Sequence, residues 1–460
     1  MFNLYLNNYR AFLNQNFKFS KINIIIGENS AGKSSLLKFL LAMKQSFENP
    51  AELNLKLSGE YADLGNFNET VYYKKSRIPI TFGFEFDNKY FDYFINFFVD
   101  REEDVTERDI DKLRKKLLSH IEGYYDTTTK VKFALSSRLN DHSTIKTVIE
   151  NEGLGNLEII QKKGGKLIEP FYYCDLKFDF GESHGILENV SFSKDAFLSL
   201  VNMELRSTCA KRYKKKGEEI FYKLAFLLIT QNYLRSQIDS IVYVNPINTN
   251  PKRFYFQEDK KNSYTHNNID KFVNLMSDNS SKSKRIDGRL SALNTLINDF
   301  GLAQEIRLVE NESLPVIGLE VRIKDLWSNI TDVGYGVSLQ LPILFEALMA
   351  EVYGGQTILI EQPEVHLHPA LQAKFIESLI SIGNKNSYFI ETHSEHIIRK
   401  LQILIKSKVI KSDDITIHYF KRGNQKFNLS VHEINEHGML IPSFPSGFYD
   451  VSYSLVKELL

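Results

Sequence analysis

Short apolar runs alternate with amphipathic segments at both ends of the chain. The run 21–26 is rich in isoleucine and predicts a buried strand, and residues 34–47 carry leucine and methionine at helical spacing. Two more apolar runs, 357–360 and 387–390, predict further buried strands. Strand and helix patterns alternate again over 290–418. This order favours an α/β fold with a mixed sheet flanked by helices.

The middle of the chain has a different pattern. Ile78–Asp87 alternates apolar and polar side chains and predicts a strand, in addition to a first strand within Met1–Phe12. Apolar residues recur at helical spacing in Asp100–Ile121 and Leu198–Ile241, so we expect a helical insertion there. Neither segment sustains apolar heptads, so we expect no long coiled coil. Asn262–Arg285 is polar and is expected to be a loop or linker.

The segment GENSAGKSS, residues 27–35, matches the phosphate-loop pattern. Gly27 and Gly32 let successive backbone N–H groups curl around phosphate oxygens. Lys33 is expected to reach the β- and γ-phosphates of a nucleotide, and the Ser34 hydroxyl to bind Mg²⁺. The other loop residues expected to bind the nucleotide are Asn29, Ser30, Ala31 and Ser35. The helix that follows adds its N-terminal dipole to this anion site.

Polar residues also follow the two later strands. Glu361 comes at the end of the run 357–360, where phosphate-loop ATPases hold Mg²⁺. His393 follows the run 387–390, where a sensor of the γ-phosphate is expected. Residues 331–342, TDVGYGVSLQLP, form a glycine-rich segment that leads into an apolar helix and predicts a second anion site.

Composition limits the classes of function. Lys plus Arg and Asp plus Glu both number 57, so any binding to nucleic acid or membrane would depend on local patches. Cys174 and Cys209 lack metal-ligand spacing and fit a reducing cytoplasm. The N-terminus lacks the pattern of a secretory signal, and no apolar run reaches the roughly 18 residues that span a bilayer, so we expect a cytoplasmic protein. The run 211–216 holds five cations and is either a solvated turn or a surface for phosphates or an acidic protein.

Together these motifs resemble a family. GENSAGKSS, DVGYGVSLQLPIL, ILIEQPEVHLHPALQ and IETHSEHIIRKL are similar to the ABC-type ATPase heads of the RecF, SMC and OLD class. Residues 244–256 and 431–450 resemble a subgroup from anti-phage defence loci, most similar to the ATPase subunit of the PARIS (phage anti-restriction-induced) system. Septu- and retron-associated ATPases are almost as similar. The resemblance covers both ends of the chain well and 45–240 poorly.

The resemblance implies a division of the chain into four parts. We expect an N-terminal ATPase lobe at 1–99, a helical insertion at 100–240, a C-terminal ATPase lobe at 241–430 and a family-specific tail at 431–460.

The resemblance also implies roles for single residues. Glu361 corresponds to the Mg²⁺-side acid, and His393 to the switch histidine. Gly334, Gly336 and Ser338 match the signature loop, which in this class closes over ATP held by a second subunit. ATP and Mg²⁺ are therefore the expected cofactors. A homodimer formed through an ATP sandwich, and a higher homo-oligomer built from it, are the expected assemblies.

Two further segments have open interpretations. Arg10 matches a position that often approaches the nucleotide, but a solvated arginine at a strand end fits equally well. Asp63–Phe67 is the best candidate for a Q-loop, although a simple turn is the alternative.

The chain departs from the family pattern at two places. Gln362 stands where ABC heads usually carry the glutamate that acts as general base, which predicts slow hydrolysis unless Glu364 or His366 substitutes for it. Gln340 follows Leu339, whereas similar sequences place a glutamine directly after the signature serine. This shift is either harmless or weakens the contact with the second subunit.

Three classes of function compete. The first is an ATP-switched sensor and scaffold that holds a toprim-type nuclease and releases it on detecting a phage component, with an acidic DNA-mimic protein or nucleic acid as the trigger. The second is a RecF-like DNA-repair ATPase, and the third is a nuclease like full OLD proteins. A Septu- or retron-type ATPase partnered with an HNH nuclease is a further alternative to the first class. A nuclease domain within this chain is disfavoured because little sequence follows His393.

Overall fold

The computed structural model describes most of both ends of the chain and parts of its middle. The described residues are 2–47, 55–74, 77–87, 111, 112, 115, 116, 119, 127–138, 141–162, 171–193, 203–244, 251–256, 268–277, 284–311, 314–423, 427–445 and 458. The chain divides into two compact units. The first consists of Met1–Phe19 and Ser34–Ser240, and the second of Ser20–Lys33 and Ile241–Leu460.

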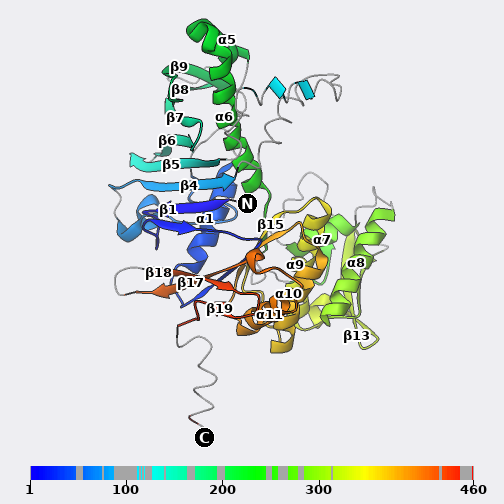
Figure 1. Ribbon diagram of the computed structural model, residues 1–460. Coiled ribbons are helices and arrows are strands. Elements are labelled where there is room, and N and C mark those ends of the chain that lie inside the picture. Colours follow the sequence, from blue (N-terminus) through cyan, green and yellow to red (C-terminus); the bar gives the residue numbers. More distant parts are fainter. Residues whose placement is uncertain are drawn as a thin grey trace. The chain divides into compact units, whose positions relative to one another are not determined.

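The first unit contains an antiparallel sheet in the order β2-β1-β4-β5-β6-β7-β8-β9 (Figure 1). Its strands are β1 (Asn3–Asn7), β2 (Gln15–Phe17), β4 (Ile80–Asp87), β5 (Thr128–Arg138), β6 (Asp141–Asn151), β7 (Gly155–Lys162), β8 (Phe171–Asp179) and β9 (His184–Ser193). Its helical segments are α1 (Lys33–Phe47, of which Lys33 belongs to the second unit), α2 (Phe67–Thr70), η1 (Tyr72–Lys74), α5 (Met203–Tyr213), η4 (Lys214–Lys216) and α6 (Gly217–Asp239). Phe39 of α1 packs edge-on against Phe82 of β4, which stacks on Phe133 of β5. These rings join the helix to the sheet.

The expected helical insertion is wrong for much of its length. The described residues within 128–193 form the five antiparallel strands β5–β9 and their connecting turns, and the longer described helices of this region lie in 203–239. The strands form because buried and more exposed side chains alternate, as at Val131, Lys132 and Phe133. Most of Asp100–Ile121 lies outside the described residues. The longest described helix is α6, with 23 residues, and no long coiled coil occurs in the described part of the chain.

The second unit is built on a sheet in the order β10-β15-β16-β3-β17-β18-β19. The five strands from β10 to β17 are parallel, and β18 and β19 are antiparallel to their neighbours. The strands are β3 (Ile22–Gly27), β10 (Ile241–Val244), β15 (Thr357–Glu361), β16 (Ser387–Glu391), β17 (Ile415–Arg422), β18 (Phe427–Ile434) and β19 (Leu440–Ile441). The start of the expected tail, Val431, lies inside β18. Much of that tail, residues 446–457, 459 and 460, lies outside the described residues.

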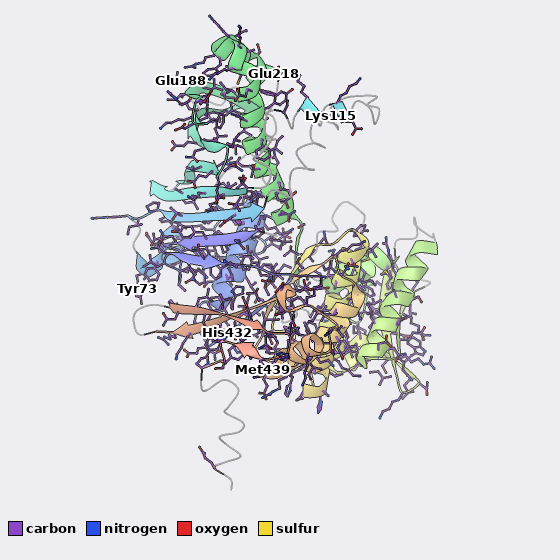
Figure 2. All side chains as sticks on the ribbon, in the orientation of Figure 1. Tyr73, Lys115, Glu188, Glu218, His432 and Met439 are labelled. Atoms are coloured by element: carbon purple, nitrogen blue, oxygen red, sulfur yellow. The ribbon has the colours of Figure 1, made fainter. Side chains whose placement is uncertain are left out.

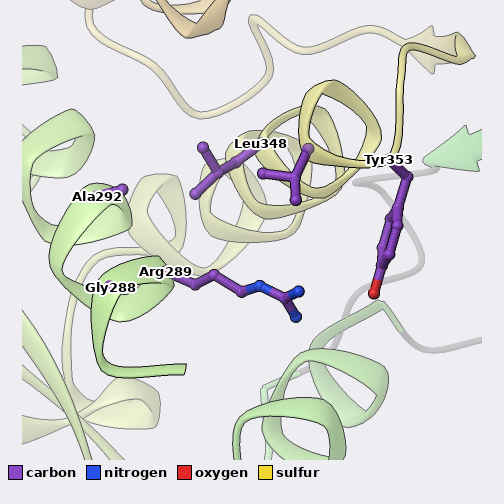
Figure 3. A pocket seen from close by; sticks show the side chains of 6 residues that line it. Gly288, Arg289, Ala292, Leu348 and Tyr353 are labelled. Carbon is purple, nitrogen blue, oxygen red and sulfur yellow. The ribbon is translucent and has the colours of Figure 1, made fainter. Parts of the chain in front are cut away.

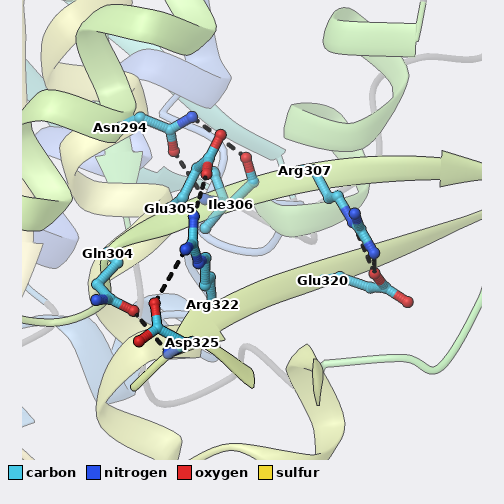
Figure 4. A network of polar contacts seen from close by, with 8 residues as sticks. All are labelled: Asn294, Gln304, Glu305, Ile306, Arg307, Glu320, Arg322 and Asp325. Carbon is cyan, nitrogen blue, oxygen red and sulfur yellow. Dashed lines mark hydrogen bonds and ion pairs between the residues drawn. The ribbon is translucent and has the colours of Figure 1, made fainter. Parts of the chain in front are cut away.

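Helices and a smaller sheet complete the second unit. The helical segments are α7 (Asn268–Ser277), α8 (Lys284–Phe300), η7 (Ile330–Asp332), α9 (Tyr335–Val352), α10 (Pro369–Ile382), α11 (Glu395–Lys406) and η8 (Ser412–Asp414). The smaller sheet contains β11 (Tyr255–Phe256), β12 (Glu305–Glu310), β13 (Val316–Ile323) and β14 (Leu326–Asn329). Cross-strand pairs such as Arg307 with Glu320, 2.7 Å apart, stabilise its surface (Figure 4).

The linker expected at Asn262–Arg285 is wrong over 268–277, which form α7. Ile269, Phe272 and Val273 of this helix are fully buried, because their spacing places them on one face. Parts of the segment on both sides of α7 lie outside the described residues.

The central strand β3 is buried along its whole length, as expected for a parallel strand covered on both faces. Its one polar side chain, Asn23, donates to the carbonyls of Ser20 and Tyr388 at 2.6 and 3.3 Å. The buried amide is therefore satisfied, and it links β3 to β16.

Helix α9 is the one described helix that is long and apolar enough to cross a membrane, and 72% of it is buried inside the protein. Its C-terminal end borders a cavity of about 570 Å³ with α8 (Figure 3). The Arg289 guanidinium lies 5.7 Å from the centre of the Tyr353 ring in this cavity. The cavity includes none of the motif residues predicted from the sequence.

Buried His418 of β17 makes the stability of the fold depend on pH. Burial lowers the pKa of its imidazole from 6.5 to about 4. As the pH falls below 6.5, the unfolded chain binds a proton that the folded chain does not, so stability decreases until the pH reaches about 4. We predict that this histidine removes about 3 kcal/mol over that interval.

Urea denaturation at several pH values tests this prediction. His418→Leu should reduce the pH dependence of the unfolding free energy between about pH 4 and 6.5 by the contribution of one proton. The matched control is His437→Leu at an exposed histidine, which should leave the dependence unchanged. An equal dependence in wild type and His418→Leu would contradict the prediction.

Candidate nucleotide site

The phosphate loop connects β3 to α1 and is closely bounded by β17. Gly27 has φ +137°, and a Cβ atom there would lie 2.0 Å from the carbonyl oxygen of Phe420. The Glu28 N–H donates to that same oxygen at 2.9 Å, and the Glu28 carboxylate accepts from the Arg422 N–H at 3.0 Å. Gly32, with φ +98°, closes the loop just before α1 begins at Lys33. The predicted glycines are thus required by backbone geometry.

Lys33 is nearly closed off from solvent, with 5% of its surface exposed. Its ammonium group donates to the carbonyl oxygens of Gly27 and Glu28 at 3.0 and 2.7 Å. Burial lowers the pKa of Lys33, while the charges of Glu391 and Glu28 oppose that shift. The loop therefore holds a cation at the end of β3.

Three neighbouring parallel strands end beside this loop. β16 lies between β15 and β3, and Glu361 is in register with Glu391, so both acids stand at the same sheet edge. The Tyr243 hydroxyl of β10 donates to the Glu361 carboxylate at 3.1 Å. Sequence reasoning missed Tyr243 and Glu391. The motif IETHS includes Glu391, but a role was predicted only for His393, two residues later.

The segment after β15 contacts the segment after β16. Gln362 has the left-handed φ of +44°, and its N–H donates to the Glu391 carbonyl at 2.7 Å. The Glu364 carboxylate accepts from the Thr392 hydroxyl at 2.8 Å and from the His393 N–H at 2.6 Å. Glu364 therefore holds the segment with Thr392 and His393 in place.

The imidazole of His393 is exposed, yet its pKa is lowered by partial desolvation and by the positive charge of Lys33, with the charge of Glu364 opposing this. This shift favours the uncharged form of the ring. A neutral imidazole can donate one hydrogen bond and accept another.

The signature residues lie at the start of α9. Gly334 is the N-cap and is exposed, as is Tyr335. Ser338 is buried, and its hydroxyl donates to the Tyr335 carbonyl at 2.9 Å. The helix therefore presents the backbone of Gly334 to solvent, whereas the hydroxyl of Ser338 faces its own helix. A contact of Ser338 with a second subunit would require that hydroxyl to turn.

The shifted glutamine has a structural role. Gln340 is fully buried, and its side-chain amide donates to the Pro363 carbonyl at 2.6 Å. The Tyr335 ring lies 5.7 Å from the His366 ring. Helix α9 thus contacts the segment that carries Gln362 and Glu364.

Arg10 and the segment 63–67 lie in the first unit and contact each other there. The Arg10 guanidinium donates to the Leu64 carbonyl at 3.0 Å, and its backbone has φ +41°. Asn66 caps the short helix α2 in a reciprocal arrangement with Glu69. The observed structure of 63–67 is therefore a capped turn.

The oxygen ligands at this edge fit Mg²⁺ that is bound together with a nucleotide. No group of three or more His, Cys, Asp or Glu side chains suited to a metal occurs among the described residues. Mg²⁺ commonly retains several waters and uses one or two protein oxygens plus phosphates. Glu361 could supply such an oxygen, and Ser34, the other residue expected to bind Mg²⁺, follows Lys33 directly in the chain.

Gly27→Ala tests the packing of the loop against β17. Ala would combine an unfavourable φ with a clash against the Phe420 carbonyl, and we expect a loss of about 3 kcal/mol or more in unfolding free energy. Gly354→Ala is the control, because Gly354 has φ +102° but no atom within 4 Å of a Cβ. It should lose only about 1 to 2 kcal/mol. Equal losses in urea denaturation would contradict the packing argument.

Comparisons with known proteins agree with a nucleotide-binding ATPase. A family model described as "AAA ATPase domain" matches residues 1–398. No curated protein matches the chain significantly.

Solved structures similar to the chain include three SMC head domains. One, bound to the C-winged helix domain of ScpA, has 11% identity, a TM-score of 0.42 and coverage of 94% of this chain and 98% of that chain. A Pyrococcus furiosus head with an extended coiled coil has 9% identity, a TM-score of 0.40 and full coverage of both chains. The Thermotoga maritima head has 10% identity, a TM-score of 0.37 and coverage of 93% and 97%. Because the family model spans most of the sequence, the chain belongs to the AAA ATPase domain family.

Proposed function

We propose that the chain binds ATP with Mg²⁺ at the loop 27–35 and uses it mainly as a conformational clamp. The observation that carries this proposal is the meeting of three motifs at one edge of the second unit. Burial lowers the pKa of Lys33 and the charge of Glu391 opposes that shift, while desolvation and the charge of Lys33 lower the pKa of His393. The Glu364 carboxylate accepts a hydrogen bond from the His393 N–H. Such convergence of charged and titratable groups is typical of functional sites.

Each residue has a task that follows from its contacts. Lys33 exchanges its two carbonyl partners for phosphate oxygens, which are stronger acceptors for an ammonium group. Glu361, oriented by Tyr243, offers an oxygen on the Mg²⁺ side. Bound Mg²⁺ supplies charge neutralisation between the phosphates. Neutral His393 donates or accepts one hydrogen bond at the γ-phosphate.

Slow hydrolysis is expected because none of the candidate residues is well suited to accept a proton from the attacking water. Gln362 is a neutral amide and orients water without taking its proton. The Glu364 carboxylate already accepts two hydrogen bonds from the segment after β16, which favours a holding role over that of a base. His366, the other candidate, lies against Tyr335.

A clamp also needs a series of contacts from α9, which carries the expected signature residues, to His393. Gln340 bonds to the carbonyl of Pro363, and the next residue, Glu364, bonds to the His393 N–H. The exposed Gly334 end of α9 suits closure over ATP held by a second copy of the chain. Closure would therefore act on His393 through one short segment.

The biological role rests on the resemblance of the motifs. We propose a PARIS-like sensor and scaffold in anti-phage defence, in the cytoplasm, that sequesters a toprim-type nuclease and releases it on contact with a phage component. Copurification of the chain with its genomic neighbours, with and without ATP and DNA, tests this role. An ATP-independent monomer that binds DNA and no protein would refute it.

Lys33→Ala should lower the affinity for ATP by about two orders of magnitude or more, because it removes the charge that faces the phosphates. Calorimetric titration of a non-hydrolysable ATP analogue with Mg²⁺ measures this change. Lys38→Ala, further along the same helix, is the control and should bind as wild type. Unchanged affinity in Lys33→Ala would show that the loop is not the nucleotide site.

Gln362→Glu should raise the single-turnover rate of ATP hydrolysis by about 10²-fold, because it restores a positioned base. Gln362→Ala, which removes the amide without adding a carboxylate, should not raise it. A rapid wild-type rate that is unaffected by Glu364→Gln and His366→Ala would contradict the clamp.

A further inference from the structure

A run of cations occupies the turn between α5 and α6 in the first unit. Lys211, Arg212, Lys214, Lys215 and Lys216 are all exposed. We call these five residues the basic tip. Figure 2 labels Glu218, which follows the tip in sequence, and shows the end of the first unit that carries this turn.

Aromatic and glycine contacts hold the basic tip in position. The Tyr213 ring packs edge-on against Phe178 of β8, with 5.6 Å between their centres. Its hydroxyl occupies the space where Gly185 of β9 would carry a Cβ, only 2.2 Å away. At Gly217 a Cβ would lie 2.5 Å from the Cys209 carbonyl, so α5 and α6 approach closely. The tip is thus fixed to the end of the sheet.

The helix dipoles explain only part of the charge. Lys211 and Arg212 lie in the last turn of α5, where cations interact favourably with the C-terminal dipole. Lys214, Lys215 and Lys216 directly precede the N-terminus of α6, where cations are disfavoured. The helix dipoles therefore do not favour three of the five charges.

The nearby acids leave most of these charges uncompensated. Glu218 bonds to Lys116 and Arg206 at 2.8 and 3.3 Å, and Glu219 bonds to Lys223 at 2.7 Å. Glu182 reaches Lys216 only at 4.0 Å and is itself 96% exposed. Within the described part of the chain, the other four members of the basic tip form no ion pair.

The composition of the basic tip indicates its ligand. Lysine is depleted at protein interfaces but suits contact with phosphate groups as a point charge. Tyr213, the aromatic residue of the run, is held against Phe178 and Gly185 and is unavailable for stacking on bases, which single-strand binders require. We infer that the basic tip binds the phosphate backbone of a nucleic-acid duplex without sequence preference.

This inference rests on the proposed sensor role, because it identifies the trigger as a nucleic-acid duplex and the basic tip as the surface that binds it. The binding itself does not depend on ATP. The test uses the full chain without nucleotide and measures the anisotropy of a fluorescent DNA duplex of about 30 base pairs, from about 50 to 200 mM salt. A matching RNA duplex distinguishes the two sources of backbone. Binding of either duplex supports the inference.

The variant Lys214→Gln, Lys215→Gln, Lys216→Gln removes the three charges that the helix dipoles do not favour. We expect affinity at low salt to fall by at least about tenfold, and the slope of log K against log salt to decrease in magnitude by about 2 to 3. The matched control is Lys406→Gln, Lys408→Gln, Lys411→Gln, at exposed lysines of the second unit. It should bind as wild type.

Three outcomes would overturn the inference. They are absence of salt-dependent duplex binding by wild type, equal loss in both triple variants, and competition by polyglutamate as effective as that by duplex. The last would assign the tip to an acidic protein. Because no nucleotide is present, each outcome leaves the proposed ATP site unaffected, and loss of ATP binding leaves this inference unaffected.

Discussion

The positive charge of Lys33, held with little access to water, is the constraint on which the rest of the candidate site depends. A buried ammonium group needs acceptors and compensating charge. Two loop carbonyls and the acids Glu28 and Glu391 supply them. After desolvation, the same charge is the second cause that lowers the pKa of His393. Lys33 thus takes part in the hydrogen bonds of the loop and also affects the pKa of a neighbouring residue at this edge of the sheet.

The parallel strands bring these groups together. Because β15, β16 and β3 run in the same direction, their C-terminal ends meet at one edge. Glu361 and Glu391 are far from Gly27 in sequence but end neighbouring strands. The register of the strands, more than any loop, determines which side chains face one another.

Much of this edge could be predicted from the sequence. The strands at 22–27, 357–361 and 387–391 are short apolar runs, and each motif directly follows one. Tyr243 could not be found in this way, because its role depends on β10 pairing with β15. Gln340 looked like a displaced signature residue, and only the buried contact with Pro363 explains its position. The β-strands within 128–193 were missed although their side chains alternate, as at Val131, Lys132 and Phe133, because the helical spacing of the charged segment before them was extended over the whole insertion.

The paired hydrogen bonds of Glu364 have a consequence for how the site can respond. One carboxylate holds both the Thr392 hydroxyl and the His393 N–H, so these two residues are released or retained together. Rotation of that carboxylate away from one donor also weakens its contact with the other. We therefore expect the segment with Thr392 and His393 to respond to such a rotation as a unit. A displacement of Glu364 would then reach Thr392 and His393 at the same time, so that neither residue would be reoriented alone.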